Sequence, residues 1–319
     1  MVGLAALLFL ASDATSLDRV FAAGESDRFD VQSRLQVEWR HRGMETWLPS
    51  DEEARYGFTV QVIRLLPQGG ARVRYKRPTL SVTKGEVADA DPVTKIEKVN
   101  WDYEMDLSVA NEILEHKDLA PKLPSKPKPP EGDGSLLPGW QEQEASPQAA
   151  AFVGRFVDDV FRLAAFTGSF DSALDLAPRL PFGPVKPGDS WKRTVGFQPQ
   201  LLKGEGGKFA IQRLDYAYVY QGIVDWNGKK VHRVVARLQL NTDLAAFLNQ
   251  AARATPEQTG LRRAPISMSA EIEFNLDLAT RKTLGAVATA EGQVGFVAAD
   301  SNEPIDEFKI KGRTVLSTK

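Results

Sequence analysis

The sequence predicts an α+β protein, in which a predominantly antiparallel, strongly curved, half-barrel-like β-sheet packs on one amphipathic helix. Three observations predict this class. Apolar and polar residues alternate over most of the chain, which is typical of strands with one face in water. Only residues 147–167 show a strong helical period. The β regions before and after that helix are similar in length, which indicates two pseudo-repeated halves.

The N-terminal β region is expected over residues 29–120. Residues 29–40 alternate throughout, and residues 56–66 and 71–82 continue the pattern around a predicted hairpin at residues 67–70. Residues 102–107 alternate again, with Tyr103, Met105 and Leu107 predicted to face inward. A polar outer face would then meet water along the whole region.

The composition changes at residues 121–145, which are rich in proline and glycine and are predicted to be an extended linker. Ser146 then provides an N-cap, Pro147 suits the first helical position, and Gly168 is placed to end the helix. The apolar stripe of this helix is wide enough to require a sheet beneath it. Residues 146–319 are therefore expected to form the helix and a second β region, in one continuous fold with residues 29–120.

The C-terminal β region follows an elbow, residues 179–191, in which three prolines exclude both helix and central strand. The elbow is expected to deliver Trp191 into the core. Asn227 and Gly228 form the strongest hairpin signal in the chain, because both tolerate positive φ. Alternating strands are then predicted over residues 268–278, 284–289, 293–297 and 308–316.

Residues 1–23 are expected to be a signal segment. Residues 4–11 are the most apolar run and match the length of a signal-peptide core, although no basic residues precede them. Cleavage is expected after Ala14 or Ala22, and the alternative is an ordinary N-terminal helix. This run is too short to span a bilayer, and no other stretch could cross a membrane. The protein is therefore predicted to be exported, to the periplasm or the extracellular space.

Composition excludes several classes of function. The formal net charge of −2 argues against a nucleic-acid partner. The absence of cysteine excludes disulfides, thiolate metal sites and cysteine nucleophiles. The basic residues Arg72, Arg74, Lys76 and Arg77 are interpreted as the solvent-facing side of a strand.

No catalytic, metal-binding or cofactor-binding signature emerges from the remaining residues. His41 and His232 are interpreted as surface side chains, and His116 would form half of a metal site with Glu112 only on a helix. A nucleophile–histidine mechanism is not favoured, because the chain has no cysteine and its histidines are isolated. A carboxylate pair assembled by the fold stays open as an alternative.

Two motifs resemble those of a family of exported bacterial β-rich proteins, a domain of unknown function. The first is Leu-Pro, Pro-Val and Gly-Asp-Ser-Trp at residues 180–191. The second is the hairpin at residues 276–284, in which the family often has glycine where Arg281 stands. The resemblance covers about two thirds of the chain. It implies the cell envelope and an antiparallel sheet, and it carries over no functional residues.

These observations favour a non-enzymatic envelope protein that binds an apolar, lipid-like ligand, or a partner protein, in the concave face of the sheet. Trp191 and a tyrosine row, Tyr216, Tyr218 and Tyr220, are the candidate wall residues, with core packing as the alternative role. A structural or assembly component of the envelope and a carboxylate-based hydrolase are the alternative functions. The sequence leaves the oligomeric state open.

Overall fold

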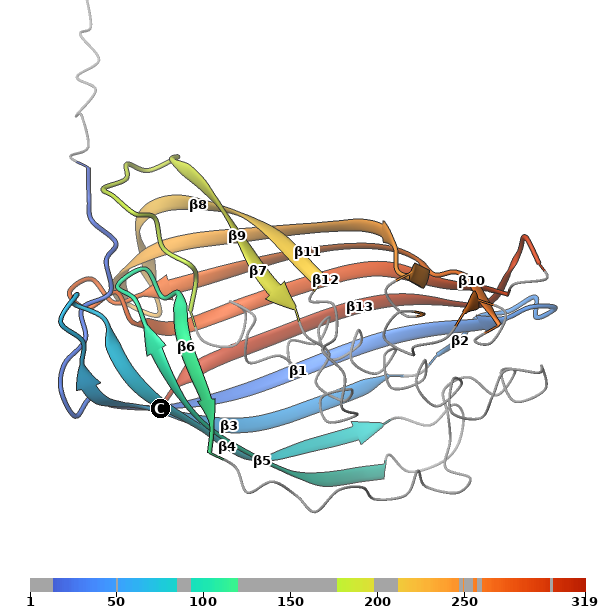
Figure 1. Cartoon of the computed structure of the whole chain (residues 1–319), viewed down its shortest axis with the longest axis horizontal. Coiled ribbons are helices and arrows are strands. Elements are labelled where there is room, and N and C mark those ends of the chain that lie inside the picture. The colour runs from blue at the N-terminus through green and yellow to red at the C-terminus, as the bar shows by residue number, and fades with distance from the viewer. Residues whose placement is uncertain are drawn as a thin grey trace, which may run out of the picture.

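The computed structural model describes residues 14–49, 51–84, 93–119, 177–197, 212–246, 249, 255–256, 260–298 and 301–319. These residues form one sheet of 13 strands (Figure 1). Its strands are β1 (Ser26–His41), β2 (Leu48–Pro49), β3 (Glu52–Leu65), β4 (Ala71–Lys84), β5 (Val93–Leu107), β6 (Ile113–Asp118), β7 (Ser190–Phe197), β8 (Gln212–Trp226), β9 (Lys229–Asp243), β10 (Leu261–Arg263), β11 (Pro265–Leu276), β12 (Thr283–Ala298) and β13 (Pro304–Thr318).

The strand order is β6-β5-β4-β3-β1-β13-β12-β11-β9-β8-β7, with β10 beside β12 and β2 beside β1. Sequential neighbours pair antiparallel on both sides of the chain's middle. The first and last long strands join the two halves, since β1 pairs with β13 from Phe29↔Thr318 to His41↔Asp306. One hydrogen-bonded sheet therefore runs through both β regions.

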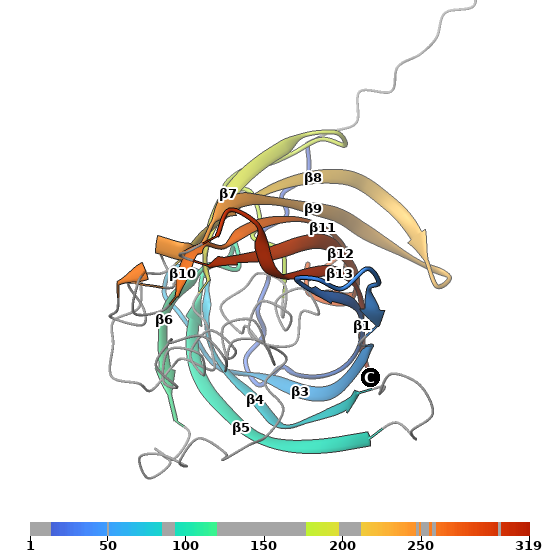
Figure 2. The same ribbon diagram turned by 90° about the vertical axis from the view of Figure 1, so that its right-hand side faces the viewer.

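The predicted α+β class is wrong, because the described residues are almost entirely antiparallel strand. The helix predicted at residues 147–167 lies outside the described residues, as does the linker at 121–145. The prediction assumed that one sheet needs a second element to bury its apolar face. Long strands instead curve around a common interior (Figure 2), and the buried side chains of both halves form a single cluster.

Alternation sorts the side chains as predicted. Val31, Leu35 and Val37 are buried on the inner face, and so are Tyr103 and Met105. The outer face carries ion pairs between neighbouring strands: Arg72–Asp106, Arg74–Asp102, Arg237–Glu271 and Arg233–Glu273. Each exposed pair adds only about 0–1 kcal/mol, so these charges fix which face meets water more than they stabilise the sheet.

The predicted hairpin between β8 and β9 is confirmed. Asn227 and Gly228 have φ of 49° and 75°, the left-handed conformation that a two-residue turn requires. The turn at residues 67–70 is also present, with Gly69 at φ 87° and the Leu66 amide donating to the Gly70 carbonyl over 2.8 Å. Both turns lie at the end of the sheet where β1 begins (Figure 1).

That end is tied together by residues 14–25, which we call the N-terminal strap. The strap leaves Leu17 only 1% exposed. Its backbone bonds reach loops from three parts of the chain, at 2.7–2.9 Å. They join Thr15 to Val185 of the elbow, Arg19 to Val109 after β5, and Val20 to Thr280 before β12.

Among the described residues the sheet is not closed, because its order ends at β6 on one side and β7 on the other. At the strap end the elbow spans this gap. The Leu180 amide donates to Ala110 beside β6, and Arg193 of β7 donates to the Leu180 carbonyl. Arg193 also lies 3.6 Å from the Glu112 carboxylate. The two end strands are thus joined through loop contacts in place of a strand ladder.

Candidate functional site

The predicted wall residues lie together on the inner face of β7 and β8. Tyr216 and Tyr218 are completely buried, and Tyr220 is 2% exposed. Trp191 pairs with Tyr218 across the two strands, and their rings stack with centroids 5.6 Å apart and planes 8° apart. The elbow therefore delivers Trp191 to the core, as the sequence predicted.

Two polar atoms of this row, on Trp191 and Tyr220, bond to other parts of the protein. The Trp191 indole donates to the Arg179 carbonyl over 2.8 Å, and the Tyr220 hydroxyl lies 2.8 Å from Nδ1 of His232. Burial raises the pKa of Tyr218 to about 12, so its phenol stays neutral. The row is well packed, and contact between these side chains and a ligand stays a prediction.

A second aromatic cluster, around Arg77 in β4, was missed. Arg77 is 1% exposed, so its predicted place in solvent is wrong. Its guanidinium lies 4.0 Å from the ring centroids of both Tyr56 and Trp101, and its Nε donates to the Tyr75 hydroxyl over 2.9 Å. The signal was available, because residue 77 has the same parity as Ala71, Val73 and Tyr75.

His232 differs from its predicted surface position, whereas His41 does not. His232 is 3% exposed, and burial lowers its pKa, so the ring that faces Tyr220 is neutral. His41 is partly exposed, and its Nδ1 lies 2.9 Å from the buried Asp306, which also accepts from the Trp39 indole. The helical alternative for His116 is wrong, because residue 116 lies in β6.

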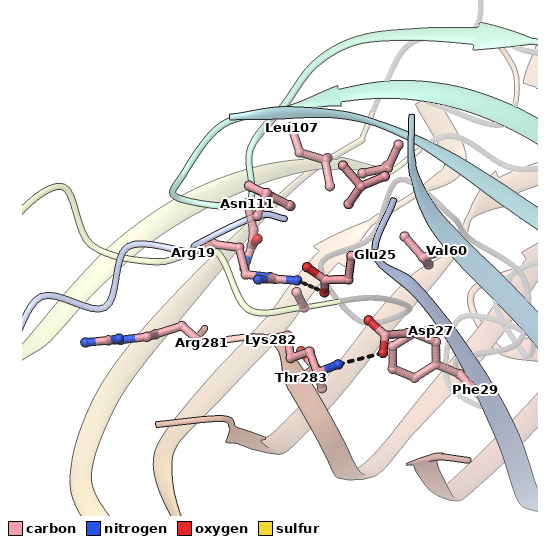
Figure 3. A pocket seen from close by; sticks show the side chains of 14 residues that line it. Arg19, Glu25, Asp27, Phe29, Val60, Leu107, Asn111, Arg281, Lys282 and Thr283 are labelled. Atoms are coloured by element: carbon pink, nitrogen blue, oxygen red, sulfur yellow. Dashed lines mark hydrogen bonds and ion pairs between the residues drawn. The ribbon is translucent and has the colours of Figure 1, made fainter. Parts of the chain in front are cut away.

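A pocket of about 60 Å³ lies where the strap, β1 and the hairpin before β12 meet (Figure 3), and we call it the polar pocket after the charged residues within its largely apolar lining. Apolar residues of the inner face contribute much of its lining, among them Phe29, Val62, Val73 and Leu107. The charged and polar lining residues include Arg19, Glu25, Asp27, Lys282 and Thr283. No local sequence pattern predicts this pocket, because its residues come from five distant parts of the chain.

Both carboxylates in the polar pocket are paired with cations. Arg19 binds Glu25, and Lys282 binds Asp27 with Nζ 2.7 Å from Oδ1, as the dashed lines in Figure 3 mark. Arg19 also donates to the Thr280 carbonyl and stacks over Phe21. The Arg281 side chain points away from the others and donates to the Ser16 carbonyl of the strap. Each carboxylate thus has a cation as its partner, which favours a fixed structure over proton transfer.

The residues that the structure describes bring together no group of three histidine, aspartate or glutamate side chains suited to a metal ion. Nor do they include a helix with the length and hydropathy needed to cross a membrane.

Comparisons with known proteins give only remote likenesses. No family model matches the chain, and no curated protein matches it. The family suggested by residues 180–191 therefore stays a prediction. Among solved structures, lipovitellin has a TM-score of 0.38 at 9% identity over 94% of this chain, which spans only 25% of the lipovitellin chain.

Two other solved structures are matched over more of their own length. DynF from the dynemicin biosynthesis pathway of Micromonospora chersina has a TM-score of 0.22 at 6% identity, with 97% of this chain and 86% of DynF covered. A DUF1329 family protein from Desulfovibrio piger has a TM-score of 0.15 at 8% identity, with 89% and 83% covered. Such low scores establish neither a shared fold nor a shared function.

Proposed function

We propose that this protein is an exported envelope protein that binds an apolar, lipid-like ligand against the inner face of its sheet, without catalysis. The observation that carries the proposal is an apolar inner face enclosed by a sheet that does not close. Such a sheet shields a hydrocarbon chain from water and leaves a side at β6 and β7 by which the chain can enter.

The make-up of the inner face supports an acyl chain as the ligand. Large rings occupy both halves, around Tyr75 in the first and Tyr218 in the second. Between them, where β11, β12, β13 and β1 pair, several neighbouring inward residues are small. This small-residue patch consists of Ala270, Ala288, Ala290, Gly312, Thr314 and Ser33. A strip of small side chains between bulky ones leaves room on the inner face for a slender hydrocarbon chain.

The outer face favours this proposal over a scaffold. A scaffold needs a contiguous exposed apolar patch. The large exposed apolar side chains are instead spread over separate segments, among them Ile63 on β3, Ile96 on β5, Phe182 in the elbow and Ile223 on β8. The charged pairs of the outer face separate them further.

The experiment is to purify the full chain from a bacterial host under non-denaturing conditions and to examine it by native mass spectrometry. We expect adducts with masses of cellular lipids, which organic extraction removes. The extracted protein should then bind the apolar dye N-phenyl-1-naphthylamine saturably. A folded protein with no lipid adducts and no saturable dye binding would overturn the proposal.

A further inference from the structure

We propose that the polar pocket is a subsite for the uncharged polar head of an amphiphile, such as a hydroxyl, amide or ester group, whose acyl chain lies along the inner face. The inference rests on the proposed function and names the class of ligand. Four observations support the inference: the pocket is continuous with the inner face, both of its carboxylates are paired with cations, one of its hydroxyls has no partner within the described residues, and it is small.

The inner face changes from apolar to polar along β1. Its inward residues alternate from Val37 through Val31 to Phe29, and the same parity continues to Asp27 and then Glu25. Phe29 stacks on Phe58 with ring centroids 4.8 Å apart, at the boundary between the two parts. A molecule on this surface would therefore meet hydrocarbon along most of its length and polar atoms only at the strap end.

The paired charges select against an ionic head. Arg19 is 8% exposed and Glu25 is 14% exposed, and each neutralises the other. Lys282 and Asp27 form the second pair, at 29% and 18% exposed. A carboxylate or ammonium placed between these pairs would lose its water and gain no unpaired counter-charge there, because the remaining cation, Arg281, points away from them and donates to the Ser16 and Ala279 carbonyls. An uncharged polar head loses much less on leaving water.

Thr283 supplies an open hydrogen-bonding position. A register shift between Asn275 and Leu276 sets Thr283 opposite Leu276, whose side chain belongs to the inner core. Bulges commonly re-aim a side chain in this way. Thr283 is 4% exposed and lines the pocket, and its hydroxyl has no hydrogen-bond partner within the described residues. A buried hydroxyl left unpaired is costly, so it marks the atom that a ligand would satisfy.

The size of the pocket fits a head and excludes a whole ligand. Its volume of about 60 Å³ is several times what one water needs. It is also well below the roughly 300–1,000 Å³ of pockets that enclose a complete small molecule. A group of a few heavy atoms fills it, and the rest of the molecule must lie on the neighbouring apolar surface.

The test compares three C12 amphiphiles that differ only in the head: 1-monolauroylglycerol, laurate and dodecyltrimethylammonium. Each competes with N-phenyl-1-naphthylamine on the full-length extracted protein, below its micellar concentration. We expect monolauroylglycerol to bind about tenfold more tightly than either ion. Equal affinities, or tighter binding of an ion, would overturn the inference and leave the proposed function standing. Absence of dye binding would overturn both.

Substitution of Thr283 provides the matched control. Thr283→Val removes the hydroxyl and keeps the shape, and should weaken monolauroylglycerol binding about 3- to 10-fold, more than it weakens binding of the headless dye. Thr283→Ser should retain the preference. The control is Thr289→Val on the exposed outer face of the same strand. Thermal unfolding of Thr283→Val should occur at the same temperature or higher, because an unpaired buried hydroxyl is lost. An unchanged head preference in folded Thr283→Val would contradict the assignment.

Discussion

Arg77 places a permanent cation where the period of β4 requires an inward side chain. Its guanidinium is tolerated because two aromatic faces contact it at 4.0 Å and the Tyr75 hydroxyl accepts from its Nε. Cation–π contacts are strongest where water is excluded, and Arg77 is 1% exposed. The neighbouring Arg72 and Arg74 point outward and meet carboxylates in water.

We expect Arg77→Ala to lower the free energy of unfolding by about 2–4 kcal/mol, since it removes two desolvated cation–π contacts and leaves a cavity. The control Arg74→Ala removes only a partly exposed ion pair and should cost about 0–1 kcal/mol. Urea unfolding followed by tryptophan fluorescence measures both. Equal losses for the two variants would show that the aromatic contacts of Arg77 contribute nothing.

His232 predicts a pH dependence of stability. Burial, with the Arg281 charge, lowers the pKa of His232 below its ordinary value of 6.5. The unfolded chain therefore binds more protons near pH 6, and stability rises with pH. The contribution of neutral His232 to the free energy of unfolding should be complete above about pH 6.5, and it should be lost as the pH falls below that value.

Urea midpoints between pH 7.5 and 5.0 test this effect on the wild type and on His232→Gln. The variant should lose much of the dependence over that range. The carboxyls of Asp102 and Asp106 affect stability only at lower pH, because their hydrogen bonds with Arg74 and Arg72 lower each pKa below its ordinary value of 3.8. Identical pH profiles for the two proteins would contradict the role of His232.

The hairpin between β11 and β12 combines backbone strain with side-chain bonding at Arg281. This residue has φ 57°, in the left-handed region that favours glycine, and its guanidinium donates to Ser16 and Ala279. The family that residues 276–284 resemble often has glycine at this position. Substitution can therefore measure the cost of the left-handed backbone separately from the stabilisation by the side-chain bonds.

Arg281→Ala should destabilise the protein, because the bonds are lost and the strain stays. Arg281→Gly loses the same bonds but relieves the strain, and should be about 1 kcal/mol more stable than the alanine variant. Chemical denaturation of both variants measures the difference. A glycine variant no more stable than the alanine variant would show that the left-handed conformation costs nothing here.

The N-terminal strap bears on where the predicted signal segment would be cleaved. Thr15, Arg19 and Val20 form the backbone bonds that hold three loops, and Leu17 is buried. Removal of residues 1–22 would delete all of these contacts, whereas removal of residues 1–14 would keep them. We therefore expect processing after Ala14, with Thr15 as the first residue. Intact mass of the exported protein decides this, and a mature chain beginning at Ala23 would contradict it.

At the scale of the molecule, the sequence predicted the strands better than their assembly. Alternation around Val31, Tyr103 and Met268 identified the inner face, and the Asn227–Gly228 turn was predicted from two residues. These features are local, so local pattern suffices to find them. The same rule applied strictly would have placed Arg77 and Asp27 on the inner face. Arg77 was missed because residue type was given more weight than parity, and Asp27 because the predicted strand began at residue 29, whereas β1 begins at Ser26.

The sequence could not predict the assembly of the sheet or of the polar pocket. The pairing of β1 with β13 joins residues nearly 290 positions apart, and no local pattern specifies it. The polar pocket likewise requires Asp27 and Lys282 to meet across the sheet. The α+β class failed for a related reason, since a long curved sheet encloses its own core.

The most direct test of the central claim, that the inner face holds the ligand, is a pair of neighbouring substitutions on opposite faces of β12. Ala288→Phe fills the small-residue patch, and Thr289→Phe adds the same ring to the outer face. Dye affinity is measured for both extracted proteins, with thermal unfolding as the check on folding. The account predicts that Ala288→Phe weakens binding about tenfold or more while Thr289→Phe leaves it within about twofold. Equal affinities in two folded variants would contradict it.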